Sequence, residues 1–135
     1  MAVSGGDVTF TISFAPGTFD PQATWLFVEV DSDRNVSTGA PTNGLGMDYF
    51  VSMSGAPGTA TVFRCPSRSA SCPDAVGAPT VSLLTNGVAI AMPLSFLGAV
   101  SSDQARFDFR IYASSPGGGP TDYMPDLTLA PAHAP

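Results

Sequence analysis

A short acidic segment carries the residues of this sequence that are best suited to chemistry. Asp31, Asp33 and Asn35 occupy alternate positions directly after an apolar run, and Thr38 and Asp48 follow within the same Gly-rich stretch. Ca²⁺ prefers carboxylate, amide and hydroxyl oxygens, and it takes about six to eight of them in flexible geometry. We therefore predict a calcium site formed by Asp31, Asp33, Asn35, Thr38 and Asp48.

This segment differs from the EF-hand loop, which has Gly at the sixth position and a bidentate Glu at the twelfth. We expect a site on a loop between strands. An alternative stays open, in which Asp, Asn and Gly only form turns and Asn35-Val36-Ser37 is a glycosylation acceptor. Clustered acids repel one another unless a cation or a helix N-terminus compensates them, which favours the metal. Asp48 can act as a ligand only if the next strand returns beside Asp31.

The residues that catalysis would need are incomplete. The only His, His133, lies in a C-terminal segment that we expect to be a flexible tail, and the sequence has no G-x-S-x-G motif. Glu29, Asp31 and Asp33 could supply a carboxylate pair. However, neighbouring Asp residues on a polar loop are poor candidates for the raised pKa of a general acid. We therefore expect a protein that binds without catalysing a reaction.

Three tyrosines are the candidate binding aromatics. Tyr49, Tyr112 and Tyr123 each neighbour a loop or a polar strand face, where a ring could stack on a sugar or a partner surface. The alternative is ordinary packing with the hydroxyl in water. We expect Trp25 in the core. The expected partner is a polysaccharide or another domain of the parent protein, and the alternative role is a structural spacer or a self-assembling module with an exposed β edge.

The elements that position these residues are expected to be β-strands, because apolar and polar residues alternate or apolar runs end at Gly and Pro. The predicted fold is an all-β antiparallel β-sandwich, jelly-roll-like, of about seven to nine strands with at most one short helical turn, at Pro93 to Gly98. Residues 1–129 form the single domain and residues 130–135 a flexible C-terminal tail. The expected strands are Val8 to Phe14, Trp25 to Val30, Asp48 to Met53, Thr59 to Arg64, Val81 to Leu84, Val88 to Met92 and Arg106 to Tyr112.

Two of these strands form the clearest hairpin. They are joined by Thr85-Asn86-Gly87, and Asn-Gly supplies the positive φ of a type I′ turn. In the last strand Arg106, Asp108 and Arg110 alternate with aromatic residues, so their charges are expected on the surface. Everything from Ser114 onward is expected to be loop.

The composition places the chain among folded, exported proteins. At 135 residues it is long enough for one core, and its net charge of −6, without Lys, repels nucleic acid. No apolar stretch has the length to span a bilayer, so we expect no membrane insertion. Residues 1–6 lack the features of a signal peptide, which suggests the mature part of a longer exported protein. An upstream strand of that protein could complete the first sheet.

The two cysteines also favour export. Cys65 and Cys72 frame C-P-S-R-S-A-S-C, and we expect them to form a disulfide that contributes about 2.5 kcal/mol. Such a bond persists in an oxidising compartment, so the expected location is secreted or at the cell surface. The alternative is a pair of free thiols in a cytosolic loop.

Several runs in a fixed order resemble a known type of domain. They are F-V-E-V-D-S-D-R-N-V-S-T-G, G-L-G-M-D-Y-F-V-S, M-P-L-S-F-L-G, F-R-I-Y-A-S and T-D-Y-M-P-D-L, and they extend from Val8 to Leu129. Together they resemble a calcium-associated β-sandwich domain of exported bacterial proteins, similar in outline to family 9 carbohydrate-binding modules and DOMON-like domains. The resemblance implies calcium at the acidic segment and an accessory role in a multidomain protein.

The resemblance has open and divergent points. T-D-Y-M-P-D would bring Asp122 or Asp126 near the ion, or would form a closing turn at Pro125. Trp25 is the only Trp, so the sugar-clamping tryptophan pair of family 9 modules is absent. DOMON-type haem ligation by Met and His is also unsupported, since the only His is His133.

Overall fold

The computed structural model describes residues 1–42, 44–66, 68, 71–99, 105–118, 121–125 and 130–134. These residues form β-strands and one short 3₁₀ helix, η1 (Leu94–Leu97). In chain order the strands are β1 (Ala2–Ser4), β2 (Asp7–Ser13), β3 (Trp25–Asp31), β4 (Ala40–Thr42), β5 (Leu45–Met47), β6 (Tyr49–Met53), β7 (Thr61–Arg64), β8 (Asp74–Gly77), β9 (Thr80–Leu84), β10 (Gly87–Pro93), β11 (Asp108–Ser114), β12 (Asp122–Met124) and β13 (Ala132–His133).

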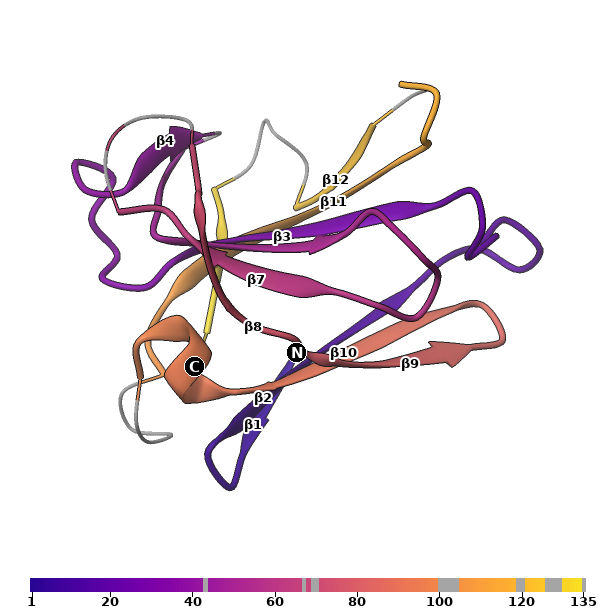
Figure 1. Ribbon diagram of the computed structural model, residues 1–135, viewed down its shortest axis with the longest axis horizontal. Coiled ribbons are helices and arrows are strands. Elements are labelled where there is room, and N and C mark those ends of the chain that lie inside the picture. The colour runs from indigo at the N-terminus through magenta and orange to yellow at the C-terminus, as the bar shows by residue number, and fades with distance from the viewer. Residues whose placement is uncertain are drawn as a thin grey trace.

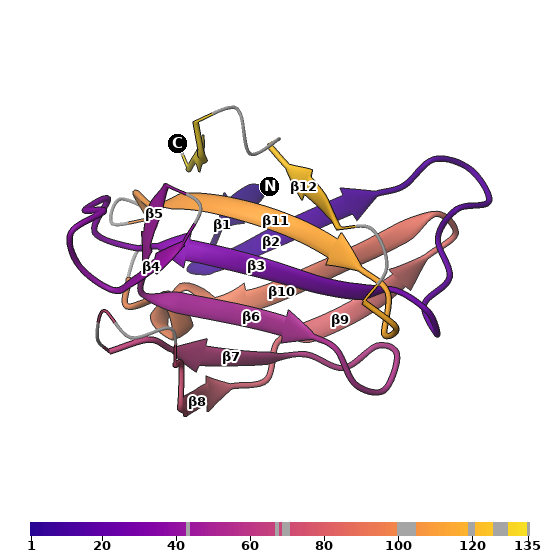
Figure 2. The same ribbon diagram turned by 90° about the horizontal axis from the view of Figure 1, so that it is seen from above.

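The strands build two antiparallel sheets that pack face to face (Figures 1 and 2). One sheet has the order β1-β2-β10-β9, and the other has the order β12-β11-β3-β6-β7-β8 with β13 paired to β11. This confirms the predicted antiparallel β-sandwich and its single helical turn. Eight of the strands have at least four residues, and this number lies within the predicted range of seven to nine. They are β2, β3, β6, β7, β8, β9, β10 and β11.

The core lies between the two sheets because alternate residues of each strand point inward. In β2 the burial alternates along the strand as the sequence pattern predicts, and Phe10 packs edge-on against Phe109 of β11 with ring centroids 5.3 Å apart. Fully buried side chains from both sheets fill the space between them: Val8, Phe10, Leu26, Val28, Val30, Val51, Val62, Val88 and Ile90. This packing fixes the pairing register of the long strands β3 and β11. The acidic segment begins at the end of β3.

The outer face of the larger sheet differs from the prediction at two residues. Arg110, expected on the surface, is only 1% exposed, and its Nη1 donates a hydrogen bond of 2.6 Å to the carbonyl of Pro125. Pro125, which follows β12, therefore lies against the Arg110 side chain. Trp25, expected in the core, is half-buried and shares the outer face with Phe27 and Glu29.

The hairpin β9–β10 is present, but its turn is not the expected one. Leu84 pairs with Gly87, so the loop is Thr85-Asn86, and neither Asn86 nor Gly87 has the positive φ of a type I′ turn. Gly87 is needed for a different reason. A Cβ at Gly87 would lie 2.1 Å from the carbonyl oxygen of Ile12 on β2.

Substituting Gly87→Ala should therefore destabilise the fold by about 1–3 kcal/mol, because the added methyl group forces β2 and β10 apart. Thermal unfolding measures this loss. Gly55→Ala is the matched control, since a Cβ at Gly55 meets no atom within 4 Å. Equal melting temperatures for the two variants would contradict the steric role of Gly87.

Two short strands, β12 and β13, lie in segments that were expected to be loop or tail. β12 pairs with β11 through Tyr112 and Tyr123, so the chain after Ser114 returns to the sheet. β13 pairs with β11 as well, and Ala134 is 3% exposed with its N–H bonded to the carbonyl of Phe107 at 2.8 Å. Residues 132–134 are therefore packed against the domain rather than a flexible tail. At the other end of the chain, β1 forms the edge of the smaller sheet.

A small hairpin and a disulfide complete the end of the sandwich near the acidic segment. β4 and β5 pair with each other within the span from Asp31 to Asp48. Cys65 and Cys72 form the predicted disulfide, and the buried side chain of Cys65 packs with Ala40 and Met47 of the hairpin. Within the part of the chain that the structure describes, no helix has the length and apolarity to cross a membrane.

Candidate metal centre

Asp31 is the buried member of the acidic group. It is the last residue of β3, pairs with Asp108 of β11, and is only 2% exposed. Its two carboxylate oxygens accept hydrogen bonds of 3.0 Å each, from the backbone N–H groups of Asn35 and Gly46. A carboxylate offers about four acceptor positions, so Asp31 keeps capacity for a further partner.

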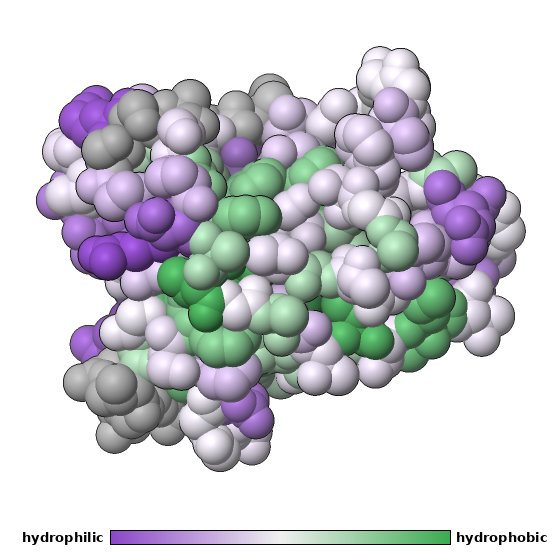
Figure 3. All heavy atoms as spheres, in the orientation of Figure 1, coloured by the Kyte–Doolittle hydropathy of each residue, from purple (hydrophilic) through white to green (hydrophobic). Residues whose placement is uncertain are grey.

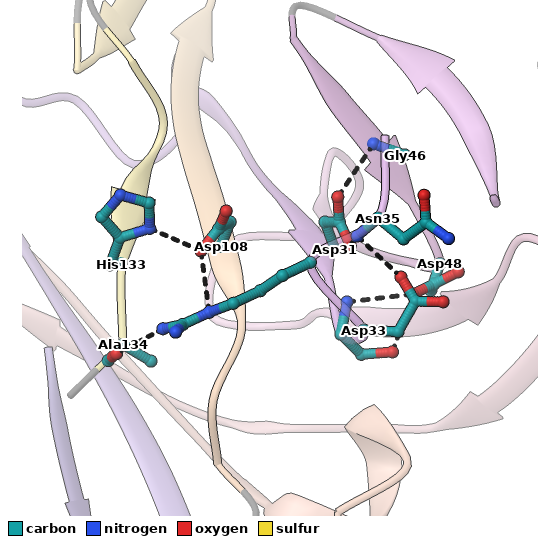
Figure 4. Close-up of polar contacts among 10 residues, drawn as sticks. Asp31, Asp33, Asn35, Gly46, Asp48, Asp108, His133 and Ala134 are labelled. Atoms are coloured by element: carbon teal, nitrogen blue, oxygen red, sulfur yellow. Dashed lines mark hydrogen bonds and ion pairs between the residues drawn. The ribbon is translucent and has the colours of Figure 1, made fainter. Parts of the chain in front are cut away.

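Asp33 and Asp48 approach Asp31 from two directions. Asp33 follows on the loop, and Asp48 lies between β5 and β6, where its N–H bonds to the carbonyl of Val30 at 2.8 Å. Oxygens of the three carboxylates all lie within 4.8 Å of one another. The strand return that the sequence analysis assumed for Asp48 is thus present, and Figure 4 shows the three side chains in one cluster with Asn35.

The other two predicted ligands have local hydrogen-bond partners. The Asn35 side chain accepts from the N–H of Ser37 at 3.1 Å. The Thr38 hydroxyl lies 3.0 Å from both oxygens of Asp33 and 2.7 Å from the carbonyl of Asn35. Thr38 therefore orients Asp33. Direct metal ligation by Asn35 and Thr38 stays a prediction.

The electrostatics of the group are unfavourable without a cation. Burial raises the pKa of Asp31, and the neighbouring Asp33 and Asp48 raise it further, against the hydrogen bonds from Gly46 and Asn35. None of the ion pairs recorded among the described residues involves these three carboxylates. The folded chain thus brings three carboxyl groups close together, and donors from Ser32, Asn35 and Thr38 bond to Asp48 and Asp33.

Two glycines allow the loop to close this tightly. A Cβ at Gly46 would lie 2.4 Å from the carbonyl oxygens of both Asn35 and Thr38, and a Cβ at Gly39 would lie 2.4 Å from that of Met47. Arg34 adds a left-handed backbone turn with φ of 56°, which directs the Asn35 N–H back to Asp31. Gly at these positions is required by close backbone approach.

A second cluster fastens the loop from the opposite side. Arg34 Nε lies 3.0 Å from Asp108, and Arg34 Nη2 donates to the carbonyl of Ala134 at 2.8 Å. His133 Nδ1 contacts the same carboxylate of Asp108 (Figure 4). Sequence reasoning missed this cluster because its members are up to 100 positions apart.

Comparison with known proteins adds no relative. No family model, curated protein or solved structure matches this chain. The likeness to calcium-associated β-sandwich domains therefore stays an expectation from the sequence, and the site has to be judged from its own geometry.

Of the predicted binding tyrosines, Tyr49 lines a pocket beside Asp33 and Asp48, and the other two lie on the outer face of the larger sheet. Tyr49 packs on the core beside Gly98, whose Cβ would be 2.8 Å from the Tyr49 hydroxyl. Tyr112 and Tyr123 lie on the outer face with ring centroids 5.4 Å apart, and Tyr112 stacks on Phe27 at 4.7 Å. Since these rings cover one another, part of the surface that a sugar would need is used within the protein.

Of the two further acids that the resemblance suggested, Asp122 lies far from the group. It pairs with Ala113, whereas Asp31 pairs with Asp108, five residues earlier on the same strand. At about 3.3 Å per residue this is a separation of roughly 17 Å along the strand. Asp126 lies outside the described residues.

Proposed function

We propose that this chain is a non-catalytic, calcium-binding β-sandwich module that serves as an accessory domain of a secreted or cell-surface protein. The observation that carries the proposal is the convergence of Asp31, Asp33 and Asp48 within 4.8 Å, with Asp31 almost fully buried. A bound dication would compensate three charges that otherwise repel. Calcium would then link the end of β3 to the start of β6.

The donor set and its spacing favour calcium over other common ions. Ca²⁺ binds oxygens at about 2.3–2.6 Å, so ligands on opposite sides of the ion lie about 4.6–5.2 Å apart. Ligand atoms that all lie within 4.8 Å of one another can therefore share one such ion. Mg²⁺ requires shorter bonds and near-ideal octahedral geometry. Zn²⁺ prefers Cys and His, which are absent from this group.

The disulfide supports the location. Cys65 and Cys72 are bonded to each other, and such bonds are rare where glutathione and thioredoxin keep thiols reduced. The extracellular space also supplies millimolar calcium, which lets a site of modest affinity stay filled.

Calorimetric titration of the chelator-treated protein with CaCl₂ tests the proposal. We expect one ion per chain at neutral pH, and weaker binding as the pH falls through the raised pKa of Asp31, because a proton then competes for the same oxygens. Without the ion, a carboxyl whose pKa is raised in the folded state stabilises the fold at low pH, and this contribution is lost as the pH rises through that pKa. If no heat of binding is measured at neutral pH, the proposal is wrong and the acidic loop is only a turn.

A second candidate role is self-assembly through an open sheet edge. β8 and β9 are edge strands, and they carry the exposed apolar side chains Val76, Leu83 and Leu84. Figure 3 shows apolar side chains gathered over these strands on one side of the molecule. Edge strands of this kind can pair with another chain. Size-exclusion chromatography separates the two roles, because an edge-pairing module elutes as an oligomer.

A further inference from the structure

The open edges of the two sheets differ in how they are protected against pairing with another chain. Natural proteins protect an edge by keeping its strand short, by placing charges on it or by introducing a bulge. β1, β12 and β13 have three residues or fewer, and β12 carries Asp122. β8 carries Asp74, and its pairing with β7 shifts register between Val62 and Phe63. Each of these edges therefore has at least one such protection.

The edge strand β9 lacks these protections. Its five residues, Thr80–Leu84, include no charged residue and no Pro, and they pair with β10 without a shift of register. Figure 2 shows β9 as the outermost strand of the smaller sheet, beside β10. Among the strands that the structure describes, only β10 pairs with it. The backbone N–H and C=O groups along its free side are therefore open to another strand.

Apolar side chains are exposed along the same edge. Leu83 and Leu84 are 45% and 44% exposed. Leu83 lies opposite Val88, which is fully buried, so Leu83 shares the core-facing side of the smaller sheet with Val81. Val81 packs against the core, whereas Leu83 extends past it at the edge. A strand added beside β9 would cover Leu83.

The distribution of charge favours a second copy of this chain as the added partner. Each copy carries a net charge of −6, so two copies repel where their acidic surfaces meet. β9 and its neighbour β10 contain none of the charged residues. Two copies can therefore approach through this edge without bringing charged side chains of these strands together.

The sequence of β9 is also complementary to itself. When two antiparallel copies of β9 are centred on Ser82, Val81 of each copy lies opposite Leu83 of the other, on the core-facing side. The backbone groups of alternate residues point to the same side of a strand, and this alternation is symmetric about Ser82. The donors of one copy thus meet the acceptors of the other. Such a two-fold interface is closed and gives a dimer rather than a fibre.

We propose that β9 pairs with β9 of a second copy, antiparallel and centred on Ser82, so that the smaller sheets of the two molecules become continuous. This proposal rests on the self-assembly role, the second candidate above, and it names the edge and the partner. The candidate calcium ligands lie outside β9 and β10, so the calcium function is independent of it. Interfaces below about 1,200 Å² are weak, so two short strands should give a dissociation constant of roughly 10–100 µM.

Sedimentation equilibrium over a range of concentrations around that constant tests the dimer. We expect the average mass to rise from one chain toward two. Ser82→Lys should weaken the dimer by about ten-fold or more, because the two-fold axis places the two added charges opposite each other. Thr11→Lys is the matched control, since it adds the same charge at an exposed position of the inner strand β2, and it should dimerise as the parent does. Melting curves first establish that both variants are folded.

Cysteine cross-linking tests the register. In the proposed pairing Ser82→Cys lies directly opposite its own copy, so oxidation with copper phenanthroline should join two chains. Thr80→Cys is exposed on the same face of β9, but it lies opposite Leu84. Its two thiols would be about 13 Å apart along the strands, so it should cross-link about ten-fold more slowly.

The outcomes separate this proposal from the roles above. If the parent stays monomeric, both this proposal and the self-assembly role are wrong. If the parent dimerises and Ser82→Lys dimerises equally well, self-assembly stands but β9 is not its edge. Equal rates of cross-linking for Ser82→Cys and Thr80→Cys would overturn the pairing centred on Ser82. The calcium titration measures the calcium function separately in each case.

Discussion

Alanine at Asp31 or at Asp33 should abolish the stabilisation of the folded chain that we propose for calcium. Each substitution removes one of the three carboxylates that converge within 4.8 Å. A ligand present at a hundred times its dissociation constant stabilises the native state by about 2.7 kcal/mol. For a domain of this size that is a rise in melting temperature of about 10 °C. Thermal unfolding of chelator-treated protein, with and without millimolar Ca²⁺, measures this rise in melting temperature.

Asp7→Ala serves as the matched control, because it removes the same charge from an exposed position on the smaller sheet. This variant should keep the full calcium-dependent rise. In the absence of calcium, Asp33→Ala should melt close to the parent, since Asp33 is exposed and the bonds that it loses to Thr38 lie in water. Retention of the full rise in both Asp31→Ala and Asp33→Ala would place the ion elsewhere.

The acidic site could be predicted from the sequence because its information is local. Asp31 and Asp33 are separated by one residue at the end of an apolar strand, and β3 pairs antiparallel with β6, which returns Asp48 to the same end of the sheet. The hydrogen bonds from Gly46 and Thr38 depend on the close backbone approach at two glycines. No repeating pattern in the sequence predicts this close approach of the backbone.

The strands were predictable where seven residues alternate, as in β2, and not where the segments are short. β4 and β5 have three residues each, and β4 includes Pro41. Both strands are too short to show an alternation of apolar and polar residues. Arg110 shows a second limit. Its alternation with aromatic residues indicates an exposed face, but the later segment through Pro125 covers it.

Replacing both cysteines by alanine should lower the stability of the domain by about 2.5 kcal/mol, the entropy that a crosslink over this short loop removes from the unfolded chain. The melting temperature should fall by roughly 10 °C. Replacing the cysteines should also weaken packing in the folded state, because the side chain of Cys65 is buried against Ala40 and Met47 of the hairpin. Thermal unfolding of the double variant Cys65→Ala/Cys72→Ala measures the loss.

A reducing agent separates the crosslink from the packing. It should lower the melting temperature of the parent protein toward that of the double variant and leave the variant unchanged, because only the parent has a bond to reduce. If the parent melts at the same temperature with and without the reductant, the crosslink does not stabilise the fold. The hairpin would then be held without the crosslink, by contacts such as the hydrogen bond from Gly46 of β5 to Asp31 at the end of β3.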